Sequence, residues 1–107
     1  MMKKRLLALL LAIALLGAGC ATVGREFPAH SVDNIIIGET DRSEIQRMFG
    51  DPWRTGIEDG KKTWTYAHYR YSLFGPEQTR DLLIRFDDEG KVASYSFNTT
   101  IEEDRTE

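Results

Sequence analysis

Cysteine and histidine are scarce in this 107-residue sequence, which has one cysteine and two histidines. A single cysteine cannot form a disulfide within its own chain. The two histidines, His30 and His68, belong to no Cys or His cluster with the spacing of a metal site. His68 is better explained as a strand residue with a hydrogen-bond partner. We therefore expect a fold without internal crosslinks, with no metal ion and no cofactor.

Motifs for covalent catalysis are also missing. No serine lies in a Gly-x-Ser-x-Gly setting. The acidic pairs at residues 58–59 and 102–103 fall in expected loop and tail segments, where carboxylates lack the burial that separates catalytic pKa values. Residues 87–90 lack the spaced acids of a calcium-binding loop and are expected to form a solvated turn. The sequence predicts no catalytic residues, and we expect the protein not to be an enzyme.

Long hydrophobic runs are absent too, and the longest covers only residues 6–16. A membrane-spanning helix needs about 20 apolar residues, which makes a transmembrane anchor the weaker interpretation. A basic cluster at residues 3–5 precedes the run, and small residues 17–19 follow it directly before Cys20. This order is typical of a secretory signal peptide. We predict such a peptide over residues 1–19.

Residues 16–20, with the sequence LGAGC, resemble the bacterial lipobox. In that motif the cysteine thiol is acylated and the chain is cut just before it. The match is close at residues 18–20, whereas the leucine stands one position earlier than usual. The resemblance implies lipidation of Cys20, with palmitate among the acyl chains. The alternative is a free or intermolecularly paired thiol, which would be a liability in an oxidising compartment.

The residue after Cys20 bears on location. Enterobacterial lipoproteins that stay in the inner membrane commonly carry Asp at this position, and here it is Ala21. The resemblance therefore implies the bacterial outer membrane, with the protein anchored on the periplasmic face through its N-terminal lipid.

The charge balance limits the class of partner. Three of the 14 basic residues lie in residues 1–19, which contain no acid, so residues 20–107 carry 11 basic and 17 acidic side chains and a net charge of −6. Phosphate backbones call for a basic face, so we expect no nucleic acid partner. General attraction to anionic lipid headgroups is disfavoured for the same reason.

The remaining chain divides into a tether, one domain and a tail. Residues 20–30 contain Gly24 and Pro28 and no apolar period, and are expected to form a lipidated tether. Residues 31–98 form the expected domain. Residues 99–107 form an acidic C-terminal tail, in which the last six residues are expected to be disordered.

Two short helices are predicted at the start of the domain. The first covers residues 31–37 and ends at Gly38. The second has Thr40 as its expected N-cap, Asp41 in its first turn and Gly50 as its C-terminal stop. Their apolar positions recur at helical spacing: Val32, Ile35, Ile36, Ile45, Met48 and Phe49.

Three strands follow, because residues 63–73, 81–87 and 91–98 alternate in polarity. A short edge strand near Arg54 and a bulge near Val92 are further expectations. One face of the first strand carries Trp64, Tyr66 and His68, and the other carries Thr65, Ala67, Tyr69 and Tyr71. Leu82, Ile84 and Phe86 are expected to face the core. The order predicts an α+β fold, with two short N-terminal helices packed on a three-stranded antiparallel β-meander (ααβββ).

Several segments together resemble the SmpA/OmlA (BamE-like) lipoprotein family. They are residues 35–40, 44–45, 49–52, 64–66, 82–86 and 90–92. The resemblance covers residues 31–98 and implies the family's fold and a non-enzymatic role among envelope proteins. One member of the family is a small lipoprotein of the outer-membrane β-barrel assembly machinery, whereas many others are not subunits of it. The arm after Cys20 is shorter here than in the family member that serves this machinery, and Tyr69 stands where that member carries an arginine.

The strand end beyond residue 68 offers candidate partner-binding residues. They are Tyr69, Arg70, Tyr71 and Phe74. Tyrosine and arginine are enriched at interface hot spots, although Tyr69 and Tyr71 also suit ordinary cross-strand packing. Arg70 is expected to point to the opposite face from its neighbours.

These observations lead to a functional hypothesis. We expect an outer-membrane lipoprotein that acts as a binding or scaffold module in outer-membrane protein assembly or envelope integrity. One alternative is a stand-alone lipoprotein that binds a ligand or inhibits an envelope enzyme. Another is a structural lipoprotein that responds to envelope stress.

Overall fold

The computed structural model describes residues 3–7 and 20–104. Residues 3–7 are helical, and the remainder of the expected signal peptide, residues 1–2 and 8–19, lies outside the described residues. Within the described ranges, no helix has both the length and the apolar character needed to cross a membrane.

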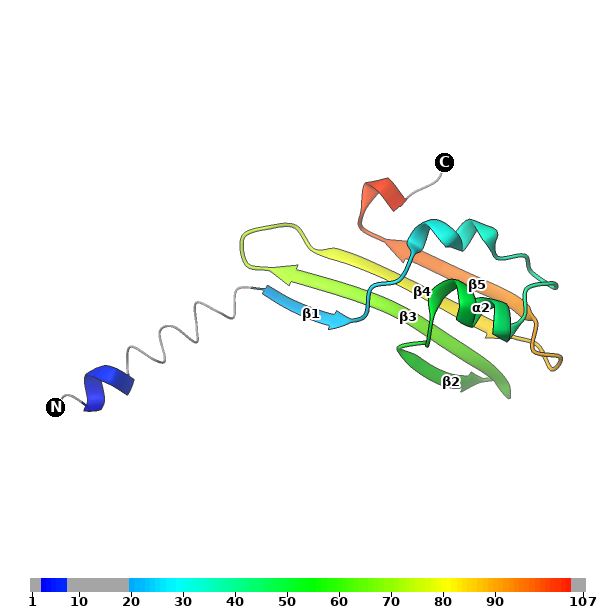
Figure 1. Cartoon of the computed structure of the whole chain (residues 1–107), viewed down its shortest axis with the longest axis horizontal. Helices are drawn as coiled ribbons and strands as arrows, with labels where there is room; N and C mark the ends of the chain where they lie inside the picture. Colours follow the sequence, from blue (N-terminus) through cyan, green and yellow to red (C-terminus); the bar gives the residue numbers. More distant parts are fainter. Residues whose placement is uncertain (1–2, 8–19, 105–107) are drawn as a thin grey trace.

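The fold is α+β and is built on one open, five-stranded antiparallel sheet (Figure 1). The strands are β1 (Cys20–Gly24), β2 (Arg54–Glu58), β3 (Lys61–Ser72), β4 (Gln78–Phe86) and β5 (Val92–Thr99). Their order is β1-β3-β4-β5, and β2 also pairs with β3. The last residues of β3 pair with β1 and its first residues pair with β2, so two short strands share one edge of one long strand. The expected meander is therefore present as β3, β4 and β5, but the prediction of a three-stranded sheet was wrong because the sheet has five strands.

Strand β1 overturns the expected tether over its first five residues. The peptide groups of residues 20–24 pair with the last five residues of β3. A strand edge presents unpaired N–H and C=O groups that are costly to leave unsatisfied away from water. A segment without apolar period can therefore become a strand when a neighbouring edge supplies its hydrogen bonds.

The helical elements are short: η1 (Ala29–Asn34) and η2 (Glu102–Asp104) are 3-10 helices, and α2 (Arg42–Phe49) is an α-helix. The expected helix over residues 31–37 begins and ends earlier, and Ile36 and Ile37 are exposed. Ile36 instead opens a turn, in which its carbonyl accepts hydrogen bonds from the N–H groups of Glu39 and Thr40. The chain is thus turned away from the helix before residue 37.

Helix α2 ends where the sequence predicts and begins one residue later. Gly50 caps its C-terminus with a φ of 81°, a left-handed conformation that costs glycine little. The N-cap is Asp41, whose carboxylate accepts the N–H of Glu44 at 2.9 Å, and the expected cap at Thr40 was wrong. Thr40 is buried, and its hydroxyl accepts the N–H of Ile36 at 2.8 Å.

The core lies between η1, α2 and one face of the sheet. Its buried members are Phe27, Val32, Ile35, Ile45, Phe49, Tyr66, Leu82, Ile84, Phe86 and Val92. The ring of Tyr66 is central, with centroids 5.4 Å from Phe49 and 6.0 Å from Phe27. The expected inward face of β4 is confirmed, and so is a register irregularity near Val92. The opposite sheet face carries no helix among the described elements and is called the open face below.

The acidic tail is partly ordered. Residues 102–104 form η2, and Asp104 pairs with Arg80 of β4. The expectation of disorder was wrong for these three residues, because a charged partner lies within reach of Asp104. Residues 105–107 lie outside the described residues.

Candidate functional site

The candidate site lies at the end of the sheet where β3 turns into β4. The register pairs Cys20 with Ser72, the last residue of β3. The loop of residues 73–77 follows at once and leads into β4. The start of β1 therefore lies beside this loop, at the opposite end of β3 from β2 (Figure 1).

Tyr69 and Tyr71 lie together on the open face. Their ring centroids are 6.4 Å apart in a tilted arrangement. In β1, Val23 pairs with Tyr69 and Ala21 pairs with Tyr71, so small or medium side chains flank the two rings. The structure thus brings together two of the four predicted binding residues, as the two-residue period of a strand requires.

A carboxylate accompanies the tyrosines. The hydroxyl of Tyr69 donates to Asp81 Oδ2 over a long 3.5 Å, and Asn98 Nδ2 donates to Asp81 Oδ1 at 3.1 Å. Partial burial and the nearby charge of Asp81 both raise the pKa of Tyr69. The hydroxyl therefore stays protonated at neutral pH and can act as a donor. An aromatic surface with polar groups at its margin is the arrangement found in protein interfaces.

The other two predicted residues lie elsewhere. Arg70 is exposed and pairs with Thr22 and Gln78, and strand alternation directs its side chain to the face that carries the helices. Phe74 lies in the loop beyond the sheet and is 97% exposed, next to Leu73, which is 74% exposed. The predicted binding residues therefore divide between the open face, the helix face and the loop.

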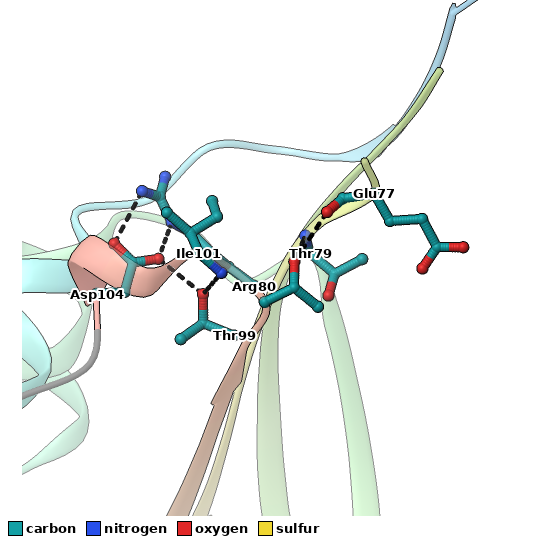
Figure 2. Close-up of polar contacts among 7 residues, drawn as sticks. Glu77, Thr79, Arg80, Thr99, Ile101 and Asp104 are labelled. Carbon is teal, nitrogen blue, oxygen red and sulfur yellow. Dashed lines mark hydrogen bonds and ion pairs between the residues drawn. The ribbon is translucent and has the colours of Figure 1, made fainter. Parts of the chain in front are cut away.

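A polar cluster lies on β4 and the C-terminal segment, and sequence reasoning missed it (Figure 2). The Arg80 guanidinium donates to both carboxylate oxygens of Asp104, with Nη2 to Oδ1 at 2.9 Å. The hydroxyl of Thr99 donates to Asp104 Oδ2 at 2.8 Å. The hydrogen bonds from Arg80, against the opposing effect of burial, lower the pKa of Asp104. A fixed, ionised carboxylate with this many donors holds the chain end in place and has little capacity left for a substrate.

The same cluster extends along the start of β4. The N–H of Thr79 donates to Thr100 Oγ1 at 2.9 Å, and that hydroxyl donates to the carbonyl of Glu77 at 3.1 Å. The N–H of Ile101 donates to Thr99 Oγ1 at 3.0 Å. Figure 2 shows these contacts side by side on one end of the sheet. They connect the chain after β5 to the start of β4.

A shallow groove of about 460 Å³ lies on the half of β3 that pairs with β2. Its lining residues are Thr55, Gly56, Ile57, Lys62, Thr63 and Trp64. Only Lys62 among them is charged, so the groove holds no acid–base pair. It could take a small apolar molecule against Trp64 and Ile57, but every residue of β2 is exposed to solvent.

No three His, Cys, Asp or Glu side chains within residues 3–7 and 20–104 are grouped so that they could hold a metal ion. Comparison of the sequence with protein-family models and with curated proteins gave no match.

Proposed function

We propose that this protein is a lipoprotein of the bacterial outer membrane, anchored at the periplasmic face through Cys20. Its α+β domain acts as a non-enzymatic module that binds other envelope proteins. The function we favour is outer-membrane protein assembly, in contact with the β-barrel assembly machinery.

One observation carries the proposal: Cys20 belongs to strand β1 and pairs with Ser72 of β3. Cleavage before this residue would remove the segment of residues 1–19 and leave all five strands whole. An acyl group on Cys20 would then be attached to the sheet itself, with no flexible linker in between. The residue that the lipobox resemblance selects is therefore itself part of the sheet.

The open face supports the binding role. Tyr69 and Tyr71 present two aromatic rings beside Asp81 on a face without a helix. The resemblance to the SmpA/OmlA family supports the assembly role, since helix α2, its stop at Gly50 and the β4–β5 hairpin follow the order of that family's segments. A BamE-like arrangement, with η1 and α2 as the two helices, is the finer fold that we propose.

A specific observation also favours a second candidate function. The groove beside Trp64 has the volume of a small-molecule site, for which about 300–1,000 Å³ is usual, and its lining includes Ile57. A stand-alone lipoprotein that binds a small apolar ligand there is the alternative. Its exposure to solvent on the β2 side makes this the weaker candidate.

The proposal is tested on protein purified from native membranes through a C-terminal tag after mild crosslinking. The intact mass should correspond to residues 20–107, the tag and acyl chains, and Cys20→Ala should abolish the acyl mass. Mass spectrometry of crosslinked material should recover subunits of the β-barrel assembly machinery. An unprocessed or unacylated chain would overturn the lipoprotein assignment. An acylated chain recovered with a small ligand and no protein would favour the groove instead.

A further inference from the structure

The hairpin tip is an exposed apolar group at the end of the β3–β4 hairpin, formed by Tyr71, Leu73 and Phe74. All three side chains are exposed, and that of Phe74 is almost entirely in solvent. Isolated exposed apolar residues are common in soluble domains and need no explanation. Three of them within four positions, at one end of the sheet, form a surface that is expected to contact another molecule.

The tip is also free of charge in a chain that is 29% charged. Residues 71–76 contain no charged side chain, and Arg70 and Glu77 are the nearest charges in sequence on each side. Strand β1, which lies against this end of β3, is uncharged over its whole length as well. The two neighbouring segments therefore form an uncharged end on an acidic domain.

The register places this uncharged end beside the anchor. Cys20 pairs with Ser72, and paired residues on adjacent antiparallel strands have Cα atoms about 4.5–5.5 Å apart. Leu73 and Phe74 are the next residues after Ser72. Because β1 is held in the sheet, the acyl chains cannot enter a bilayer without bringing the hairpin tip to its surface.

We propose that the hairpin tip inserts Leu73 and Phe74, its two most exposed residues, into the membrane interface in which the lipid on Cys20 is embedded. This inference rests on the proposed lipidation of Cys20 and deepens it by naming a second membrane contact. Aromatic and leucine side chains are favoured at the level of the headgroups and the acyl boundary. Because β2 pairs with the opposite end of β3, β2 and its groove would then lie at the end of the sheet that is farther from the bilayer.

The test uses the lipidated protein with one added thiol. Cys20 is the single cysteine of the chain, and once acylated it leaves an introduced cysteine as the single free thiol. Phe74→Cys carries an environment-sensitive fluorophore at the tip, and Ile57→Cys is the matched control. Ile57 is also apolar and 77% exposed, but it pairs with Lys62 at the opposite end of β3. Neither position is buried, so neither substitution threatens the fold.

Both proteins are reconstituted in vesicles of phosphatidylethanolamine and phosphatidylglycerol, and acylation is verified by intact mass. We expect a blue-shifted emission at position 74 but not at 57. Nitroxide groups on the lipid acyl chains should quench position 74 several-fold more strongly than position 57. Leu73→Ser in the Phe74→Cys protein should reduce that quenching, because the tip loses its second apolar group.

Other outcomes overturn the inference and leave the lipoprotein assignment standing. An acylated protein with equal signals at both positions would show no preferential insertion of the tip. A blue shift at position 74 in native envelope membranes but not in lipid vesicles would assign the tip to a protein partner. Failure of acylation would instead overturn the proposed function on which the inference rests.

Discussion

Gly24 and Ala67 are in such close contact that a Cβ atom at position 24 would lie 2.1 Å from the Ala67 carbonyl oxygen. Gly24 also has a φ of 82°, and the next residue, Arg25, donates its N–H to that same carbonyl at 2.9 Å. This contact ends β1 and directs the chain across β3 towards the core residue Phe27. Glycine is required here for two independent reasons, conformation and space.

Gly24→Ala should therefore detach β1 from the sheet. The left-handed conformation alone costs about 1–2 kcal/mol for a residue with a Cβ, and the clash with Ala67 adds to this. Gly60→Ala is the control, since Gly60 has a φ of 76° but open space around its Cα. Denaturant unfolding should show the larger loss for Gly24→Ala, and hydrogen exchange should show lost amide protection in β1. Equal losses with β1 still protected would contradict this prediction.

The ion pair between Arg80 and Asp104 should make the free energy of unfolding depend on pH in the acidic range. The folded-state pKa of Asp104 is lowered, so its stabilisation is present above the ordinary value near 4 and is lost as pH falls through the folded value. Asp104→Asn should lower the unfolding free energy by about 1.5–3 kcal/mol at neutral pH, the usual contribution of a hydrogen bond to a charged group. The same substitution should also weaken the dependence of the unfolding free energy on pH in the acidic range. Glu102→Gln, an exposed neighbour in η2, should change neither quantity appreciably.

Tyr66 should be the tyrosine that resists ionisation. Burial first, and the charge of Asp51 second, raise its pKa far above the ordinary value. The protonated form is favoured in the folded state, so its stabilisation is present below about pH 10 and is lost as pH rises above it. In an absorbance titration of the wild type, Tyr66 should be the last tyrosine to form a phenolate, and it should do so together with alkaline unfolding. The titration of Tyr66→Phe should lack this last step.

The same substitution tests a hydrogen bond. The Tyr66 hydroxyl donates to the Gly50 carbonyl at 2.8 Å, and its removal leaves that acceptor unpaired. Tyr66→Phe should lower the unfolding free energy by about 1–2 kcal/mol. Tyr71→Phe removes a hydroxyl from an exposed ring and serves as the control. A loss of similar size in both variants would show that the Gly50 contact is not the cause.

The open face should carry the partner contact. Tyr69→Ala with Tyr71→Ala should reduce crosslinking to envelope partners by about tenfold or more, because truncating a central aromatic hot spot commonly costs roughly 2 kcal/mol or more of binding free energy. Acylation and circular dichroism should be unchanged. Ile57→Ala alters a more exposed apolar residue on β2, beside the other end of β3, and should leave crosslinking intact. Undiminished crosslinking in the tyrosine variant would place the contact elsewhere.

Local signals in the sequence predicted several elements correctly. Helix α2 was found from its apolar spacing and its stop at Gly50, and the hairpin of residues 87–90 was found from its acidic run and Gly90, which has a φ of 81°. The two faces of β3 followed from alternation alone. These features depend on neighbours in the chain, so a window of a few residues contains the information.

The errors have a different cause. Thr40 and Asp41 are both good N-cap residues. Asp41 caps the helix because the hydroxyl of Thr40 already accepts a hydrogen bond from the N–H of Ile36. Asp104 was read as tail charge because its partner, Arg80, lies on β4, far from it in sequence. Neither contact is visible in a local pattern.

For the candidate site as well, some features follow from the local sequence and others only from the tertiary structure. The sequence by itself determined the charge of the domain and the shared face of Tyr69 and Tyr71, because these are properties of composition and of a two-residue period. It also predicted Cys20 as the lipidated residue, through the resemblance of residues 16–20 to the lipobox. Only the tertiary structure decided that β1 joins the sheet and that Cys20 lies opposite Ser72. That register depends on hydrogen bonds between residues 44 to 52 positions apart along the sequence, and no local preference encodes it.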